Sequence, residues 1–572
     1  MRKLFNIQLG LLQGGILASI KVNDKPINVK DGLPLGVSLY EAGIYSYEGS
    51  FKLGRPRGPI SFEWWSPERV YVEGYGPVSH SLMKCSDGLK IRVRSGGIKR
   101  PFIEAVSPLL KVGFQHGYFF RSRVGWRVTW SFMKRTLPHP EIPDEVEKKE
   151  FPSPLEIETD VLVVGGGVSG LSAAISAGKT GAKVVLLEGN DEFGGHLFYD
   201  ERIKDLVKEA EKSGVKMVKG TALAAVLEDA LVATQFNEPD AKPILVSTKS
   251  IVLATGAREV LPVFGNNDLP GIMLGTSALR LVKLYGVKPG RKGVVIGSSK
   301  WAVEIAKLLS SSGIDITLVH DREVEKTDGI KTIKARVTEA FGKDRVRGVR
   351  LDDGSTLEAD FIALANIRAP NIDIATQFGV KIGFHMRLGG FVPLHGWRGE
   401  TSVDGVFIAG EAGGVDEEEA LIHLSRAAGL SAAEHAGFSA PGIEDEISEG
   451  RKISKNMEEL VNGYKSGDLC IFDDDMGLLQ NPDHKRSFLC PCLDVTTSDV
   501  KRIVKELGWI KMEKIKRYSG LGTGRCQGKY CLLSSVIYTS KIGNVKPVEV
   551  GIFRMRPPSV PIQLEVLGGM DR

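Results

Sequence analysis

The chain has 572 residues, of which 42% are hydrophobic and 25% are charged, and its formal net charge at pH 7 is +5. This length predicts three or four domains, and the composition is typical of a globular protein. So small a charge on so long a chain, with no dense basic run, excludes nucleic acid as an expected partner.

The cysteine content and the absence of targeting signals predict a cytoplasmic protein. Six cysteines are too few for a disulfide-built secreted chain of this length. The apolar N-terminal run is interrupted by Asn6, Gln8 and Gln13 and is followed by no convincing small-residue cleavage site, so no signal peptide is predicted. No other stretch has the length and apolarity of a transmembrane segment, and none is predicted.

Residues 1–137 are expected to form a β-grasp domain followed by a docking segment. Apolar residues alternate through 17–29 as in a hairpin, a helical stretch follows, and residues 50–58 form a loop rich in glycine and arginine. The aromatic and basic segment 114–137 predicts a docking surface for another subunit or domain, rather than a membrane-surface helix. Residues 138–158, rich in proline and glutamate, predict an extended linker.

A dinucleotide-binding domain is predicted for residues 159–275 and 389–440. A buried strand leads into the turn Gly165-Gly-Gly167-Val168-Ser169-Gly170, a helix follows, and a second strand ends at Glu188. Gly165 allows the tight turn, Gly167 lets the backbone approach a pyrophosphate, and Gly170 lets helix and strand pack closely. The helix N-terminus offers free N–H groups to phosphates, and Glu188 is placed to bind ribose hydroxyls.

Further segments of the same domain are expected to border the cofactor. The additional residues predicted there are Gly195, His196, Ala222, Ala254, Thr255, Gly256, Gly410 and Glu411. The pair Gly410-Glu411 stands where FAD proteins of this architecture often have Gly-Asp, which favours FAD; NAD and ATP remain alternatives. A lone histidine is more often a hydrogen-bonded loop residue, so His196 is assigned no catalytic role, and no catalytic residue is predicted.

Residues 276–388 predict a second, inserted Rossmann domain with an impaired ligand site. Its fingerprint has Ser299 and Ala302 in place of the second and third glycines, and Trp301 adds bulk beside them. Neither nucleotide domain contains a dithiol, because Cys85 lies upstream of both and Cys470 downstream. This argues against a thioredoxin-reductase or lipoamide-dehydrogenase activity.

The C-terminal domain, residues 441–572, contains four cysteines in two close pairs. Cys490 and Cys492 form Cys-Pro-Cys, and Cys526 and Cys531 enclose four residues. Four thiolates are the usual ligands of a 2Fe–2S cluster, and the glycine-rich loop before Cys526 lets backbone N–H groups approach sulfur. A disulfide pair or a tetrahedral zinc site are the alternatives, although this spacing is unusual for zinc.

In this order the segments resemble the α subunits of heterotetrameric sarcosine oxidase, dye-linked proline dehydrogenase, opine oxidase and hydrogen cyanide synthase. The similarity covers nearly the entire chain. It rests on Arg55-Pro-Arg57-Gly58, on Phe193-Gly-Gly195 with the glycine turn, and on segments 516–531 and 556–558. The resemblance implies that residues 1–137 include a ferredoxin-like domain. It departs from its metal-bearing relatives and carries no cluster, because Cys85 alone cannot hold one.

The resemblance implies an oxidoreductase subunit of a two-Rossmann flavoprotein fold. Amine oxidation would take place in a partner β subunit that carries FAD, with FMN at the subunit interface. Further small subunits are compatible with this assembly. This chain would bind a dinucleotide and transfer electrons through its cluster. Sarcosine, proline and other secondary amines are equally compatible substrates. The alternatives are a structural subunit with an unreactive NAD or ATP, and a free-standing NAD(P)H-dependent flavoprotein.

Overall fold

The computed structural model describes most of the chain. The described residues are 17–50, 53–93, 124, 127, 151–227, 230–235, 241–325, 329–563, 566, 568 and 569. The predicted docking segment 114–137 lies outside them except for Val124 and Arg127, and so do the apolar N-terminal run and residues 138–150 of the predicted linker. Among the described helices, none is long and apolar enough to cross a membrane.

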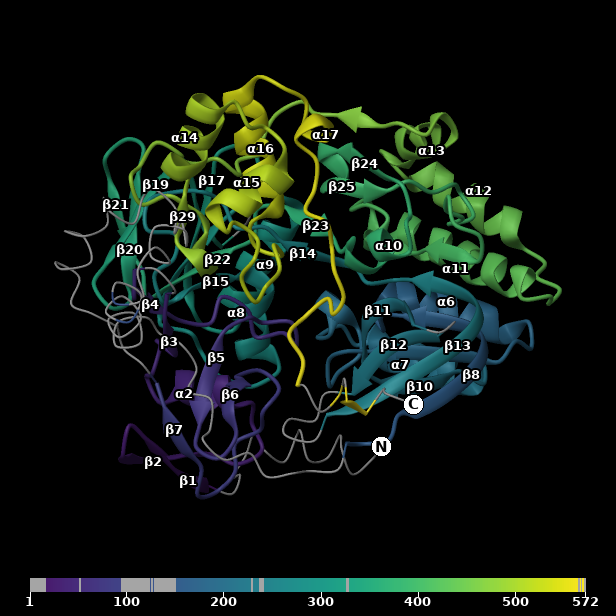
Figure 1. Ribbon diagram of the computed structural model, residues 1–572, viewed down its shortest axis with the longest axis horizontal. Coiled ribbons are helices and arrows are strands. Elements are labelled where there is room, and N and C mark those ends of the chain that lie inside the picture. The colour runs from purple at the N-terminus through teal and green to yellow at the C-terminus, as the bar shows by residue number, and fades with distance from the viewer. Residues whose placement is uncertain are drawn as a thin grey trace.

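A seven-stranded sheet forms the centre of the first dinucleotide-binding domain (Figure 1). Its strands in spatial order are β10 (Lys216–Lys219), β9 (Val184–Glu188), β8 (Leu155–Val164), β13 (Lys242–Leu253), β12 (Ala230–Gln235) and β11 (Thr221–Leu227), with β26 (Val406–Ile408) pairing with β13. β10, β9, β8, β13 and β26 pair in parallel, whereas the β13–β12 and β12–β11 pairs are antiparallel. β8 begins at Leu155, inside the predicted linker, and its last four residues are buried, as their apolar run requires.

Two helices of small residues cover one face of this sheet. They are α6 (Val168–Lys179) and α11 (Glu418–His435), and α7 (Arg202–Lys212) packs beside α6. Contact between α6 and α11 is close, because a Cβ on Gly429 would lie 2.1 Å from the carbonyl oxygen of Ala173. Such tight packing holds the glycine turn at the start of α6 in a fixed position.

The second Rossmann domain is a parallel five-stranded sheet with helices. Its strands in spatial order are β15 (Ile272–Leu274), β22 (Phe361–Leu364), β16 (Lys292–Ile296), β17 (Asp315–His320) and β18 (Lys331–Lys334). The helices are α8 (Gly275–Lys283) and α9 (Lys300–Ser311), and β19 (Val337–Gly342), β20 (Val346–Leu351) and β21 (Thr356–Glu358) form a separate antiparallel sheet.

Short strands lie close to the predicted limits of this insertion, residues 276 and 388. β14 (Ala257–Glu259) pairs with β23 (Arg368–Pro370), and this two-stranded sheet carries the chain into and out of the insertion. Beyond it, α10 (Asp373–Gln377) precedes a hairpin of β24 (Ile382–His385) and β25 (Gly390–Pro393), which spans the predicted boundary at 389. The sequence pattern marked the βαβ unit but not the short strands that enclose it.

The N-terminal domain is a mixed five-stranded sheet with one helix against it. Its strands in spatial order are β2 (Lys25–Lys30), β1 (Leu17–Val22), β7 (Lys90–Arg92), β5 (Arg69–Val72) and β6 (Gly76–Ser79), and α2 (Leu35–Glu41) follows the first hairpin. The hairpin turns at Asn23 and Asp24, whose φ angles of 47° and 65° suit these residue types. β1 and β7 are parallel, and alternate residues of β1 are buried.

The C-terminal region is mainly helical. Its helices are α12 (Ile443–Ile453), α13 (Met457–Ser466), α14 (Thr497–Leu507), α15 (Met512–Ser519), α16 (Leu532–Gly543) and α17 (Pro547–Val550). β27 (Cys470–Ile471) adds to β24, and β28 (Phe488–Cys490) pairs with β29 (Val495–Thr496) around the Cys-Pro-Cys turn. Thr496 and Asp499 form a capping box that starts α14 directly after this turn.

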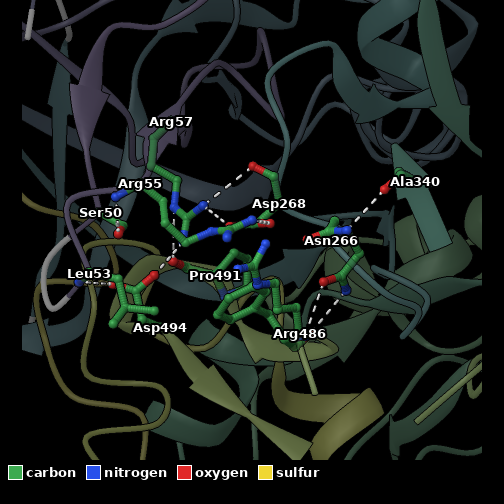
Figure 2. A network of polar contacts seen from close by, with 12 residues as sticks. Ser50, Leu53, Arg55, Arg57, Asn266, Asp268, Ala340, Arg486, Pro491 and Asp494 are labelled. Atoms are coloured by element: carbon green, nitrogen blue, oxygen red, sulfur yellow. Dashed lines mark hydrogen bonds and ion pairs between the residues drawn. The ribbon is translucent and has the colours of Figure 1, made fainter. Parts of the chain in front are cut away.

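A buried ion network joins the N-terminal domain to the rest of the molecule (Figure 2). It starts next to β4 (Pro56–Arg57), which pairs with β3 (Glu48–Gly49). Arg55 donates two hydrogen bonds of 2.6 Å to the carboxylate of Asp268. Arg57 contacts the same carboxylate and also that of Asp494, which follows the Cys-Pro-Cys turn. The carboxylates are fully buried, so each needs its arginine partners.

We predict that Asp268→Asn destabilises the fold by about 3–5 kcal/mol, because two buried guanidinium groups lose their shared counter-charge. Burial alone would raise the pKa of Asp268, but Arg57 and Arg55 outweigh it and hold the pKa below its usual value. The stabilisation is therefore complete above an unfolded-state pKa of about 3.9 and is lost as the pH falls below it. Urea unfolding at several pH values measures both effects.

The matched control is Glu449→Gln, which removes an exposed ion pair with Lys452 and should leave the unfolding midpoint unchanged. An Asp268→Asn protein as stable as the wild type at neutral pH would contradict the role given to this network.

Candidate functional site

A cavity of about 220 Å³ opens at the carboxyl ends of β8, β9 and β13. Of the residues predicted to border a cofactor, those that line it are Gly165, Gly167, Val168, Ser169, Gly170, Glu188, Gly195, His196, Ala222, Ala254, Thr255, Gly256 and Glu411. Gly410 does not line it, because it packs behind the wall, where its added Cβ would lie 2.3 Å from Ser169 Oγ. The parallel strands bring these distant segments to one edge of the sheet, where such folds bind ligands.

The glycines of the turn have three different environments. Gly165 has a φ of +109°, and a Cβ there would lie 2.2 Å from the carbonyl oxygen of Ala254. A Cβ on Gly170 would lie 1.8 Å from the carbonyl oxygen of Gly165, so strand and helix touch at this point. A Cβ on Gly167, by contrast, would lie no closer than 3.9 Å to any atom beyond its chain neighbours. The open space is at the N-terminus of α6, where no side chain caps the helix and the first N–H groups are free for a phosphate.

Glu188 is buried at the end of β9 and holds the turn in place. One carboxylate oxygen accepts the N–H of Gly166 at 2.7 Å, and the other accepts the N–H of Asn190 at 2.6 Å. Burial raises the pKa of Glu188. Each oxygen keeps a second lone pair, so the carboxylate can also accept hydrogen bonds from ribose hydroxyls in the cavity.

At the other end of the cavity, Glu411 is paired with an arginine that the sequence did not single out. Arg368, from β23, donates to Glu411 Oε1 at 2.6 Å and also contacts the second oxygen. The same guanidinium lies 2.9–3.0 Å from the ring nitrogens of His196 and over the ring of Trp301. Burial, followed by Arg368, holds the pKa of His196 well below its usual value, so the imidazole is neutral.

The second nucleotide fingerprint is occupied by the protein's own contacts. Ser299 caps α9 by accepting the N–H of Ala302 at 3.1 Å. The indole of Trp301 donates to Glu259 at 3.0 Å, and Ser298 donates to Asp321 at 2.9 Å. The polar groups at this turn therefore have partners within the chain.

Three segments from outside the dinucleotide fold complete the cavity, and the sequence did not predict them. Lys529, between the second pair of cysteines, reaches its wall and forms an ion pair with Asp373 at 2.8 Å. Ser559 approaches from the C-terminal segment, and its carbonyl oxygen accepts Lys529 Nζ at 2.6 Å. Residues 63–65 come from the N-terminal domain. The adjacent tryptophans Trp64 and Trp65 were the one feature in the sequence that could have indicated a ligand contact, but their spacing does not connect them to the glycine turn.

The four C-terminal cysteines lie together in the interior. Cys492 Sγ is 3.5 Å from Cys526 Sγ. Cys490 interacts with the thiols of both Cys492 and Cys531, and these contacts hold the pKa of Cys490 well below its usual value. These contacts link all four thiols to one another. In the part of the chain that the structure describes, no group of three or more His, Cys, Asp or Glu side chains has the arrangement of a site for a metal ion.

Backbone N–H groups surround these sulfur atoms. Cys490 receives hydrogen bonds from Gly522 and Leu493, and Cys526 from Gly528 and Tyr530. The glycine-rich loop approaches so closely that a Cβ on Gly524 would lie 2.7 Å from Cys492 Cβ. N–H groups directed at sulfur stabilise negative charge there, which is the environment that an iron–sulfur cluster requires.

Comparison with known proteins agrees with this architecture. The pyridine nucleotide-disulphide oxidoreductase model matches residues 134–248 and 160–429, and the sarcosine oxidase A3 domain model matches residues 484–570. The sarcosine oxidase α subunit of Rhizobium meliloti (strain 1021) is 24% identical over 98% of this chain, and an opine oxidase subunit of Agrobacterium tumefaciens (strain Ach5) is 23% identical over 71%. The chain belongs to the pyridine nucleotide-disulphide oxidoreductase family, and over nearly its whole length it resembles sarcosine oxidase α chains and their opine oxidase counterparts. The resemblance predicted from the motifs is thereby confirmed.

The coverage of these relatives differs. The chain spans 58% of the α subunit from Rhizobium, 46% of the α subunit from Corynebacterium sp. (strain P-1), to which it is 26% identical, and 91% of the opine oxidase subunit. It therefore spans about half the length of the sarcosine oxidase relatives that it matches. In fold it is similar to L-proline dehydrogenase from P. horikoshii, with a TM-score of 0.72, 22% identity, and coverage of 98% of this chain and 99% of that one. This confirms the predicted pair of Rossmann-type domains.

The glycine turn gives a test that separates folding from binding. Gly167→Asp should keep the thermal midpoint of the wild type, because Asp is a good N-cap and the space around Gly167 is open. Its carboxylate would occupy the place of a phosphate, so we expect nucleotide affinity to fall at least about tenfold through charge repulsion. Gly167→Asn is the neutral control of similar size. Calorimetric titration with ADP-ribose and thermal melting measure both properties.

Gly170→Ala should behave in the opposite way. The added methyl group would collide with the Gly165 carbonyl, and we expect a loss of about 1–3 kcal/mol in stability. Undiminished nucleotide binding by Gly167→Asp would rule out a phosphate at the N-terminus of α6.

Proposed function

We propose that this chain is the electron-transfer and dinucleotide-binding α subunit of a flavin-dependent secondary-amine oxidoreductase. Amine oxidation would take place in a partner β subunit with its own flavin, with FMN at the subunit interface. The observation that carries the proposal is the presence, in one chain, of a built nucleotide cavity and a buried set of four thiols. The relatives' names, sarcosine oxidase and opine oxidase, support an amine as the substrate class.

The four thiols fit a 2Fe–2S cluster by their chemistry. Cys490, Cys492, Cys526 and Cys531 supply the complete donor set, and no other side chain is needed. When bound, the cluster would supply one-electron transfer. The chain's own contribution would be to exclude water, since three of the four cysteines are buried, and to direct backbone N–H groups at sulfur.

For the nucleotide, FAD, NAD and ATP share the contacts at the glycine turn and Glu188. They differ at the far end, where an FAD ribitol would have to share Glu411 with Arg368. Because that carboxylate already accepts from both arms of a guanidinium, the pairing supports a nucleotide that does not depend on Glu411. This favours the second candidate function, a subunit in which NAD or ATP is bound but does not react.

The finer fold assignment follows the same reasoning. We infer that residues 17–93 are a β-grasp domain without a cluster, supported by the order of its strands and by the parallel pairing of β1 with β7. Its single cysteine, Cys85, is buried and far in sequence from the other five. Electron transfer in this chain would therefore depend on the C-terminal thiols alone.

Metal and nucleotide analysis of the anaerobically purified chain tests the proposal. We expect two irons and two acid-labile sulfides per chain and an EPR signal on dithionite reduction. Cys526→Ser should abolish the signal, whereas Cys85→Ser, in the core of the N-terminal domain, should leave it unchanged. Zinc in place of iron, or a protein free of metal, would contradict electron transfer by this chain.

The nucleotide is identified in the same preparation by denaturation and chromatography. A flavin that bleaches on reduction would favour a subunit that carries its own flavin, or a free-standing flavoprotein. NAD or ATP that does not react, in a protein without a cluster, would favour the structural subunit. Mass analysis of the native complex shows whether the chain is purified together with a β subunit.

A further inference from the structure

One wall of the nucleotide cavity comes from the N-terminal domain. Two adjacent tryptophans lie there, in the loop between β4 and β5, and they have different environments. Trp65 is 6% exposed, donates its indole N–H to Glu63 at 3.1 Å and packs edge-on against Tyr530 with ring centroids 5.4 Å apart. Trp64 is only partly buried although it lines the same cavity. Part of its surface is therefore available to a ligand.

The position of Trp64 is set by a glycine at the end of β9. A Cβ on Gly189 would lie 2.9 Å from Trp64 Nε1 and 3.1 Å from its Cδ1, so the indole rests directly on this residue. Gly189 follows Glu188, the carboxylate placed to bind ribose hydroxyls. The base of a nucleotide is bonded to that ribose. An indole in contact with Gly189 is consequently within reach of the base.

The glycine turn beside Glu188 offers a different chemistry. The free N–H groups of α6 and the open space at Gly167 suit charged phosphates, whereas the indole offers an aromatic face with no charge. Purine rings are flat and weakly polar, and they gain most from stacking on an aromatic side chain in a desolvated wall. The helix N-terminus and the indole thus match the phosphate and the base of an adenosine phosphate.

We propose that Trp64 is the base-contacting residue of the nucleotide site, so that the N-terminal domain completes a site begun by the dinucleotide fold. The inference rests on the proposed function, because it requires a nucleotide in this cavity. It adds a ligand contact from a segment that is not part of either Rossmann unit.

Titration of the nucleotide-free, full-length protein with ADP-ribose, AMP and inorganic pyrophosphate tests the inference. We expect Trp64→Ala to weaken ADP-ribose and AMP about 10- to 100-fold, the range of one base–aromatic stack, and to leave pyrophosphate unchanged. Trp64→Phe should restore most of the affinity. Gly189→Ala should weaken the same two ligands, because its methyl group would lie 2.3 Å from Thr221 Oγ1 and 2.9 Å from Trp64 Nε1 and would displace both side chains.

Tryptophan fluorescence gives a second readout. ADP-ribose should quench the wild type and the control Trp397→Phe, whose indole does not line the cavity, but should quench Trp64→Phe less. If Trp64→Ala does not fold, the difference in quenching between the wild type and Trp64→Phe shows whether the ligand contacts Trp64, and the Gly189→Ala titration supports it.

The outcomes separate the inference from the function on which it rests. A wild type that binds none of the three ligands would overturn the nucleotide site itself. A wild type that binds, with Trp64→Ala equal to it or weakened equally for pyrophosphate, would overturn the base contact and leave the site in place.

Discussion

The buried carboxylate of Asp268 is the interaction on which the arrangement of the domains depends. It lies before β15, receives both Arg55 and Arg57 from the N-terminal domain, and through Arg57 is linked to Asp494 beside the cysteines. Burying any one of these carboxylates or guanidinium groups without its partner would cost free energy, whereas the paired charges compensate one another. Three segments that are remote in sequence must therefore meet, and this fixes the N-terminal domain against the nucleotide cavity and against the cysteine loop at the same time.

One consequence is that the cavity and the thiols share a loop. Between Cys526 and Cys531, Lys529 points into the nucleotide wall and pairs with Asp373, while Tyr530 packs on Trp65. A ligand in the cavity and a cluster on the cysteines would thus contact neighbouring residues of the same short segment. Such proximity suits a protein in which nucleotide binding and electron transfer are combined, and it also suits a nucleotide that only stabilises the cysteine loop.

The far end of the cavity shows how a familiar motif changes its role through a distant residue. Glu411 stands at the end of a strand as an acid does in related flavoproteins, yet Arg368 from the returning strand β23 holds it. Burial raises the pKa of Glu411, and the arginine opposes that effect. The strand and its acid are local features, whereas the guanidinium arrives only because β14 and β23 pair across the whole inserted domain.

What the sequence determined by itself were features whose cause is local. These features follow from the backbone freedom and the size of adjacent residues. They are the turn from Gly165 to Gly170, the acid at Glu188, the second fingerprint and the hairpin at Asn23 and Asp24. Only the tertiary structure decided which remote side chains reach the site. Trp64, Arg368 and Lys529 come from three separate regions of the chain, and their approach depends on buried charges and strand pairing that no spacing reveals. The cysteines belong to both categories, because their pairs are visible in the sequence while their joining across the glycine loop is a result of folding.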